Sequence, residues 1–432
     1  MPIFCLILAA ATLTPTRTVA PFPCETEDLS FSVAKWERLP QESRWVSDVS
    51  NAWVSASSPE VSFKRPWRWY FRRTALRLDG VAADFTVTVN GRAVGESKGT
   101  AGVLEFDLTP HLKWFGANRL SFVLGKTADG GPVFRHAYLV STHSRAPREL
   151  KVETWIADDF RQAKFKVLDE KGTVLKERTI PNPVLWSDEI PAVCLTPIEH
   201  RWGWWIFGGT EYRSVKFGFK KTEVKDGKVF VNGRPARLRA LAPHRTTPGF
   251  GGQPTTARKM VQDLTFIKGL NANAVFAADY PKTPEWYELC DRDGVYVIAG
   301  EDEATPPDRP CVLRLPKAQM PARTAVPAEA KELAALKTAF SPVRALGFDW
   351  ASGVLKIRND YRFCDLDRLD GVSWRSYDAA GKEVAKGPLA LLKLQPGAVG
   401  EVTFKDVKGE KIRVEFVMDD DAVVRQEFTK GK

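Results

Sequence analysis

Short runs in which apolar and polar residues alternate dominate the first half of the chain. They follow one another from Phe63 to Val140, and the run Asp84-Phe-Thr-Val-Thr-Val-Asn90 leads into the Asn-Gly pair of a tight hairpin. A period of two residues is typical of strands with one buried face. We therefore predict an antiparallel β-sandwich here, and a smaller second one at about 148–219, where the alternation continues between Gly and Pro residues.

The period changes near residue 221. Thr255 or Thr256 can cap a helix that runs to Leu270, and apolar residues inside it recur at helical spacing. We expect strands at 236–240, 273–276 and 295–299, with a second helix at 284–292. This order, β-α-β-α-β, predicts the beginning of a parallel α/β unit.

The α/β pattern stops after residue 300. Residues 306–328 are rich in proline and are interpreted as a linker, and 328–337 are expected to form one helix. Alternation returns from Phe340 to Phe428, which predicts a third sandwich at the end of the chain. The predicted fold class is therefore mainly β.

Composition and charge narrow the possible functions. The chain has 432 residues and a net charge of +10, but its Lys and Arg are interleaved with acids, so no basic stripe indicates nucleic-acid binding. No stretch has the length and apolarity of a membrane span. The apolar start, Met1 to Ala20, is similar to an export signal, so we expect a secreted or periplasmic protein. A ragged N-terminus is the alternative interpretation of this segment.

The cysteines predict no metal site. Beyond Cys5, which lies in the expected signal, the remaining five are irregularly spaced and form no Cys-x-x-Cys motif. An odd number at irregular spacing indicates neither a disulfide framework nor zinc.

Several segments along the chain carry motifs of one known family, in the family's order. The segments are Phe85–Gly95, Glu105–Thr109, Gly116–Leu120, Pro183–Pro191, Val215–Phe219, Asn271–Val275, Trp286–Asp291, Gly294–Val297, Phe340–Val343, Ile357–Phe363 and Val372–Trp374. Taken together, they resemble the glycoside hydrolases of family 2, the β-galactosidase type. The N-terminal sandwich, the immunoglobulin-like domain, the opening of the barrel and the sandwich after the barrel of that family are each represented.

The resemblance implies a domain order. It consists of an export signal (1–22), a galactose-binding-like jelly-roll sandwich (23–146), an immunoglobulin-like sandwich (147–220), a truncated remnant of a TIM barrel (221–305), a linker with a short helix (306–338) and a C-terminal immunoglobulin-like sandwich (339–432).

The resemblance also implies a retaining glycosidase with two glutamates at the carboxyl ends of barrel strands 4 and 7. Here the chain passes from the third strand, near residue 300, to the terminal sandwich at residue 340. Five more strand-helix units need on the order of 30 residues each, so they do not fit. The family's acid/base follows an Asn, and the chain contains no Asn-Glu pair. We therefore expect no catalytic residue of the family type.

Positions that the family uses at the barrel mouth have also changed. Its Asn-Arg-His-Glu corresponds to Ala242-Pro-His244-Arg245, which keeps only the His, and its Arg-x-x-His before Tyr-Pro corresponds to Phe276-Ala-Ala-Asp279. The magnesium-site residues give way to Ala299-Gly-Glu301-Asp-Glu303, so no cofactor or metal is expected. We interpret 301–303 as a solvated acidic loop.

Candidate substrate-binding residues are His244, Asp279 and three of the fourteen tryptophans, namely Trp202, Trp204 and Trp205. Aromatic rings stack on sugar faces, so the Trp cluster suits carbohydrate; packing inside a sandwich is an equally good interpretation. A structural role is the alternative for His244. A single carboxylate such as Asp279 does not make a glycosidase.

The sequence thus leaves three hypotheses. The first is a non-catalytic protein that binds glycans or acts as a scaffold. The second is an active β-glycosidase in which a partner chain or unrecognised residues complete the site, and the third is a gene fragment, which the in-frame return to the terminal sandwich argues against. Three parallel strands leave a sheet edge uncovered. We therefore expect the neighbouring sandwiches, the 328–337 helix, or another subunit in a homodimer to cover it.

Overall fold

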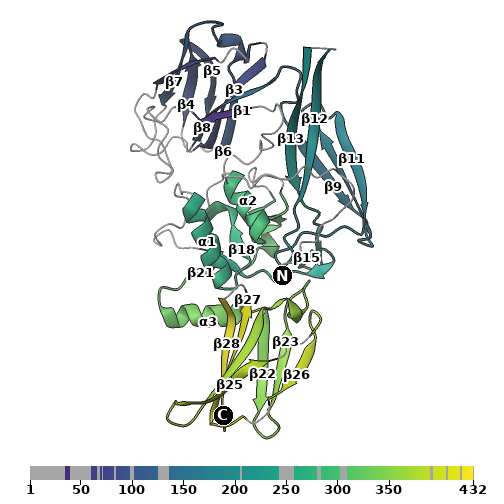
Figure 1. The fold of residues 1–432 in the computed structure, drawn as a ribbon, viewed down its shortest axis with the longest axis vertical. Coiled ribbons are helices and arrows are strands. Elements are labelled where there is room, and N and C mark those ends of the chain that lie inside the picture. The colour runs from purple at the N-terminus through teal and green to yellow at the C-terminus, as the bar shows by residue number, and fades with distance from the viewer. Residues whose placement is uncertain are drawn as a thin grey trace.

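The computed structural model describes residues 35–38, 60–65, 69–70, 72–81, 84–97, 102–124, 136–204, 207–242, 257–279, 284–301, 309–389, 393–404, 407–418 and 421–431. Three β-sandwiches surround a central α/β part: the first two lie on one side of it and the third on the other (Figure 1). The prediction of a mainly β protein is confirmed. The expected export signal lies outside the described residues. Among the described residues, none of the helices combines the length and apolarity that a membrane crossing needs.

The first sandwich consists of two four-stranded antiparallel sheets with Leu76, Leu78 and Phe122 in the core between them. Asn90 and Gly91 both have positive φ and join β4 to β5, as the Asn-Gly pair predicts. The strands are β1 (Lys35–Arg38), β8 (His136–His143), β3 (Arg72–Val81) and β6 (Gly102–Asp107) in one sheet, and β2 (Glu60–Lys64), β7 (Ala117–Leu124), β4 (Phe85–Val89) and β5 (Arg92–Ser97) in the other.

The second sandwich pairs a three-stranded sheet with a long two-stranded hairpin. Phe165, Phe217 and Phe219 fill the space between them. The strands are β9 (Lys151–Ile156), β10 (Gln162–Leu168) and β11 (Val174–Pro181) in the first sheet, and β12 (Cys194–Trp204) and β13 (Phe207–Phe217) in the second.

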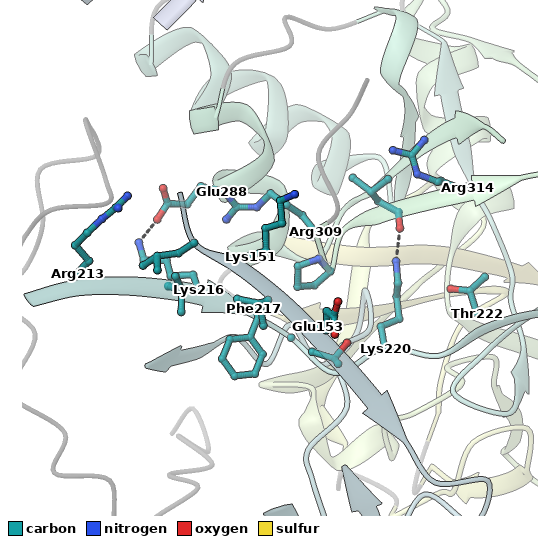
Figure 2. A pocket seen from close by; sticks show the side chains of 17 residues that line it. Lys151, Glu153, Arg213, Lys216, Phe217, Lys220, Thr222, Glu288, Arg309 and Arg314 are labelled. Carbon is teal, nitrogen blue, oxygen red and sulfur yellow. Dashed lines mark hydrogen bonds and ion pairs between the residues drawn. The ribbon is translucent and has the colours of Figure 1, made fainter. Parts of the chain in front are cut away.

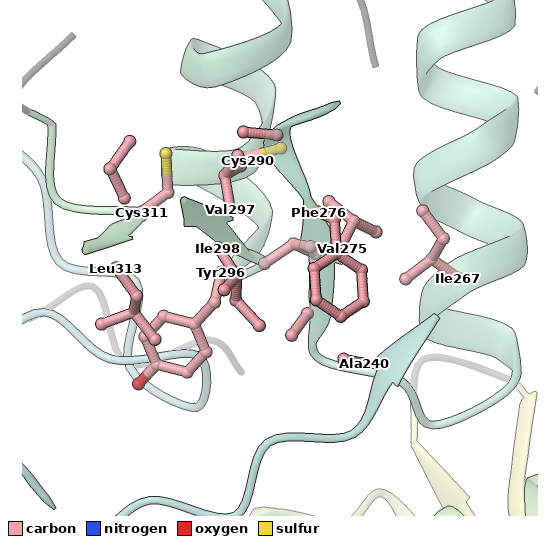
Figure 3. Close-up of a cluster of buried hydrophobic side chains, with 14 of the residues drawn as sticks. Ala240, Ile267, Val275, Phe276, Cys290, Tyr296, Val297, Ile298, Cys311 and Leu313 are labelled. Atoms are coloured by element: carbon pink, nitrogen blue, oxygen red, sulfur yellow. The ribbon is translucent and has the colours of Figure 1, made fainter. Parts of the chain in front are cut away.

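The α/β part holds the largest buried core, shown in Figure 3. Its parallel sheet has the order β20-β19-β18-β17-β21, and α1 and α2 pack together beside it. The elements are β17 (Ala240–Ala242), α1 (Ala257–Gly269), β18 (Ala274–Phe276), α2 (Pro284–Asp293), β19 (Tyr296–Gly300), β20 (Val312–Leu315) and β21 (Thr324–Ala325), preceded by β14 (Thr222–Lys225), β15 (Lys228–Val231) and β16 (Arg234–Pro235).

The linker interpretation of the proline-rich segment is wrong in one respect. The segment contributes β20, which pairs with β19, and β21, which pairs with β17, so both outer positions of the sheet come from it. The prolines bound these short strands without interrupting them, and each strand supplies hydrogen bonds that a sheet edge would otherwise lack. The expected helix is present as α3 (Ala330–Phe340), and its Leu333, Leu336 and Phe340 pack against the central core.

The third sandwich is antiparallel, with Trp374, Ile412 and Phe416 in its core. Its strands are β22 (Val343–Asp349), β23 (Val354–Asn359) and β26 (Val399–Thr403) in one sheet, and β25 (Glu383–Leu389), β24 (Gly371–Tyr377), β27 (Lys411–Met418) and β28 (Asp421–Thr429) in the other. Single 3-10 turns are η2 (Thr109–His111), η4 (Ala277–Asp279), η5 (Lys317–Gln319) and η6 (Leu366–Arg368).

Candidate functional site

The carboxyl ends of the parallel strands are the natural place for a ligand site, because loops at this end of an α/β sheet project side chains into a common space. Asp279 lies in η4, directly after β18, and Glu301 follows β19. His244, Asp302 and Glu303 lie outside the described residues, so His244 stays a prediction.

The Asp279 carboxylate is bound by Arg323, which immediately precedes β21. The Arg323 Nη2 donates to Asp279 Oδ1 at 2.6 Å and also contacts Oδ2. The Arg323 guanidinium lies 4.3 Å from the centre of the Phe276 ring, within the range of a cation–π contact. Since β21 pairs with β17, this arginine reaches across β17 to the end of β18. Arg323, which belongs to the proline-rich segment 306–328, therefore contacts both oxygens of the Asp279 carboxylate.

The Asp279–Arg323 contact is an ion pair and not a pair of carboxylates. Retaining enzymes hold two carboxyl groups about 5 Å apart on either side of a sugar, and inverting enzymes hold them about 6.5–9.5 Å apart. The carboxylate of Asp279 faces a guanidinium, and Glu301 is exposed at the end of the next strand. Among the described residues, no group of three or more His, Cys, Asp or Glu side chains could hold a metal ion.

The predicted tryptophan cluster belongs to a different part of the molecule. Trp202, in β12, stacks on His143 of β8, with ring centres 4.7 Å apart and planes 12° apart. His200, also in β12, places its Nε2 3.3 Å from His143 Nδ1. Trp202 and His200 therefore both pack on His143, in a contact between the first two sandwiches. Trp204 ends β12 but its side chain is outside the described residues, as is all of Trp205.

The amino ends of the same strands carry a dense polar network that sequence reasoning assigned no role. Asn273, just before β18, accepts a hydrogen bond from the Arg239 backbone N–H at 2.7 Å and donates to Asp188 Oδ2 at 2.6 Å. The Arg239 guanidinium lies 3.6 Å from Asp188. The Trp186 indole N–H donates to the Asp291 carbonyl at 2.8 Å, and its ring packs edge-on against Tyr296.

Glu189 extends this network into the third sandwich. Its carboxylate accepts hydrogen bonds from the backbone N–H groups of Arg362 and Phe363, with a shortest distance of 2.7 Å. Burial, and then the neighbouring Asp188, raise the pKa of Glu189 above its usual range. The run Pro183–Pro191 thus joins the second sandwich, the α/β part and the third sandwich. In the sequence, this junction is marked by Trp, Ser, Asp and Glu between the two prolines of the run.

The cysteine thiols are poor candidates for a nucleophile. Among the described residues Cys194, Cys290, Cys311 and Cys364 are free. Burial raises the pKa of Cys194 to about 11, and it also raises that of Cys364 to about 11. Because the thiolate is the reactive form, these side chains stay largely protonated and unreactive near neutral pH.

The central part of the chain matches a known family model. Residues 222–307 match the model described as glycosyl hydrolases family 2, TIM barrel domain. This part of the chain is similar to the barrel domain of the family 2 glycosyl hydrolases. This agrees with the resemblance of the sequence motifs.

Solved structures similar to this chain include β-glucuronidases. The enzyme of Bifidobacterium dentium, complexed with coumarin-3-O-glucuronide, is 21% identical with a TM-score of 0.45, over 56% of this chain and 51% of that one. The enzyme of Bacteroides uniformis is 18% identical with a TM-score of 0.44, over 56% and 36%. The enzyme of Dictyoglomus thermophilum is 16% identical with a TM-score of 0.45, over 62% and 56%. The chain thus spans between about a third and a little over half of these proteins.

Proposed function

We propose that this relative of the family 2 glycosyl hydrolases is non-catalytic and binds carbohydrate or acts as a scaffold. The observation that carries this proposal is the way the α/β part is built. A catalytic barrel of this type has eight parallel strands, whereas the described residues form a parallel sheet of five, two of them from the segment that leads to the third sandwich. We interpret the sheet as a truncated barrel remnant.

The residues at the carboxyl ends of the parallel strands support the proposal that the protein does not hydrolyse glycosides. Hydrolysis of a glycoside requires one carboxyl group to deliver a proton and another to attack the sugar or activate water. Asp279 is held by Arg323, and the family's Asn-Glu pair does not occur in the chain. The magnesium-site residues of the family are likewise replaced, so the proposed function uses no cofactor.

Carbohydrate binding is the favoured role because the sandwiches are retained with intact cores. Trp202, Trp204 and Trp205 are the first aromatic candidates for a sugar contact, with His244 and Asp279 as polar ones. The apolar start of the sequence suits action outside the cytoplasm, where glycans are abundant. We propose secretion or a periplasmic location for this reason.

A second candidate function is a β-glycosidase in which a partner chain or unrecognised residues complete the site. The observation that favours it is β20, whose outer edge ends the parallel sheet and is where a further barrel strand would pair.

Hydrolysis of nitrophenyl β-glycosides tests the first proposal. Purified protein is assayed on the galactoside, glucuronide and mannoside, beside matched Asp279→Asn and Glu301→Gln variants. We expect no turnover above buffer for any of the three proteins. Turnover by the native chain that either variant abolishes would overturn the non-catalytic proposal. A glycan array with the native chain and a Trp202→Ala variant then tests sugar binding.

A further inference from the structure

A groove of about 820 Å³ lies between the second sandwich and the α/β part (Figure 2). Strands β9 and β13 form one wall, and α2 with the segment around β20 forms the other. Ligand sites on proteins usually have volumes between about 300 and 1,000 Å³, so this groove is large enough for a small oligosaccharide. Neither Asp279 nor Arg323, at the carboxyl ends of the strands, lines the groove.

The charges that line the groove are predominantly positive. Six basic side chains face two acidic ones, Glu153 and Glu288; the basic ones are Lys151, Arg213, Lys216, Lys220, Arg309 and Arg314. Glu288 is paired with Lys216. A concave surface with charges of one sign concentrates the field and attracts ligands of the opposite sign. The groove therefore favours an anionic ligand.

The basic side chains are distributed along the groove instead of meeting at one point. Figure 2 shows Arg213 and Lys216 toward one end, Lys151 and Arg309 in the middle, and Arg314 toward the other end. Such an arrangement suits a linear ligand with repeated negative charges better than a single small anion.

The walls of the groove are held in place by close packing. A Cβ on Gly218, at the end of the second sandwich, would lie 2.8 Å from the Pro310 Cγ before β20, so only glycine permits this approach. Lys220 donates to the Val312 carbonyl of β20. The Arg309 guanidinium donates to Asp291 Oδ2 at 2.7 Å behind the groove, which fixes the base of this wall. A preformed site loses less free energy on binding than one that must be ordered.

The two walls also present hydrogen-bonding groups of the main chain. Strand β9 is the last strand of its sheet and β20 is the last strand of the parallel sheet, so both are edge strands. Outward N–H and C=O groups of edge strands can serve a ligand rich in hydroxyl groups, although those of Val312 in β20 are engaged by the Arg309 carbonyl and by Lys220. Among the described residues that line the groove, the one aromatic side chain is Phe217, which is 5% exposed and offers no stacking surface. Single-stranded nucleic acid, which relies on such stacking, therefore fits poorly.

We propose that this groove binds an acidic oligosaccharide, with carboxylate or sulfate groups of successive sugars bound by the basic side chains and sugar hydroxyls by the strand edges. The proposal rests on the proposed carbohydrate-binding function for the class of ligand, and on the groove itself for the charge and the place of binding. It holds whether or not any hydrolysis remains.

Isothermal titration calorimetry on the full chain tests the proposal. The probes are a galacturonate hexasaccharide, which carries carboxylates, a heparin-derived hexasaccharide, which adds sulfates, a neutral galacto-oligosaccharide, and polyglutamate as a polyanion without sugars. The variant is Lys151→Glu with Arg314→Glu, since both side chains are exposed. The matched control is Lys331→Glu with Lys382→Glu, the same charge change at exposed positions outside the groove. Circular dichroism confirms that both variants fold.

We expect at least one acidic hexasaccharide to bind, and the tighter of the two to identify the acidic group. The groove variant should weaken this binding at least about tenfold and the control less than about twofold, and added salt should weaken it further. Equal losses in the two variants would overturn the assigned location. Polyglutamate binding as tightly as the sugars would overturn the ligand class. Binding of the neutral sugar alone would overturn this inference and leave the proposed function intact. Binding of no sugar would overturn this inference and count against the carbohydrate-binding role, leaving the scaffold role.

Discussion

The two ends of the parallel sheet differ in how many partners their polar side chains have and in how deeply these are buried. At the amino end, Asp188, Glu189 and Asn273 lie in contacts that connect three domains. At the carboxyl end, Asp279 is held by one half-exposed arginine, Arg323, from a nearby segment. In barrel folds the amino end serves stability and the carboxyl end serves chemistry. The contrast shows that polar contacts at the amino end join domains, whereas Asp279 at the carboxyl end is held by one ion pair.

The physical basis of this contrast is the cost of leaving a buried polar group without a partner. Asp188 and Asn273 are enclosed by three domains, so losing one partner would leave the others desolvated and unpaired. At the carboxyl end, Arg323 is half exposed, so water can replace its lost partner. Substitution is therefore tolerated at the carboxyl end much more readily than at the amino end.

The largest effect is expected from Trp186→Ala at the amino end. Trp186 is fully buried and its indole N–H donates to Asp291, so truncation leaves a cavity and an unpaired carbonyl at the junction of the domains. We expect the free energy of unfolding to fall by about 3–5 kcal/mol. Urea unfolding followed by circular dichroism measures this. The matched control is Trp155→Ala, at a tryptophan that is 46% exposed on β9, with an expected loss below about 1 kcal/mol. Equal losses would contradict the assignment of Trp186 as a central contact.

An intermediate effect is expected from Glu189→Gln. Whichever way the Gln amide is turned, its nitrogen would face the N–H group of Arg362, which costs about 1–3 kcal/mol near neutral pH. Burial raises the pKa of Glu189, so its charged form is disfavoured in the folded state and protonation on acidification relieves this cost. The native chain should therefore gain stability relative to the Gln variant as the pH falls from about 7 to about 5.

Urea unfolding of both proteins at the two pH values provides this measurement. If the stability advantage of the native chain over the Gln variant shrinks on acidification, the backbone hydrogen bonds from Arg362 and Phe363 affect the pKa of Glu189 more than burial does.

The smallest effect is expected from Asp279→Asn at the carboxyl end. The ion pair with Arg323 is half exposed on the arginine side, so solvent screens it and its loss should change the free energy of unfolding by less than about 1 kcal/mol. The comparison with Glu189→Gln tests the two ends with the same chemical change, from acid to amide. A larger loss for Asp279→Asn than for Glu189→Gln would reverse the contrast between the ends.

Sequence patterns predicted local features well. The Asn90-Gly91 hairpin, the helix after Thr256 and the helix near residues 328–337 are each present as α or β elements close to their expected bounds. Each depends on interactions within a few residues, such as the backbone conformation that Asn and Gly permit or the apolar face of one helix. The relation to family 2 was also visible, because its motifs lie in local runs.

The sequence did not indicate the contacts made between distant segments. The strands β20 and β21 were missed because each is only a few residues long and bounded by prolines, and they are stabilised by strands far away in the sequence. Arg323 carries no sign of its partner Asp279, 44 residues earlier. The basic groove is hidden in the same way, because its lysines and arginines come from two domains.

By itself, therefore, the sequence determined the mainly β character of the chain, the positions of most strands and helices, and the resemblance to family 2. The tertiary structure decided that the proline-rich segment completes the parallel sheet, that Glu189 binds the third sandwich, and that basic side chains line one groove. The physical reason is that periodicity and turn chemistry act over neighbouring residues, whereas the pairing of buried charges and sheet edges depends on which distant segments folding brings together.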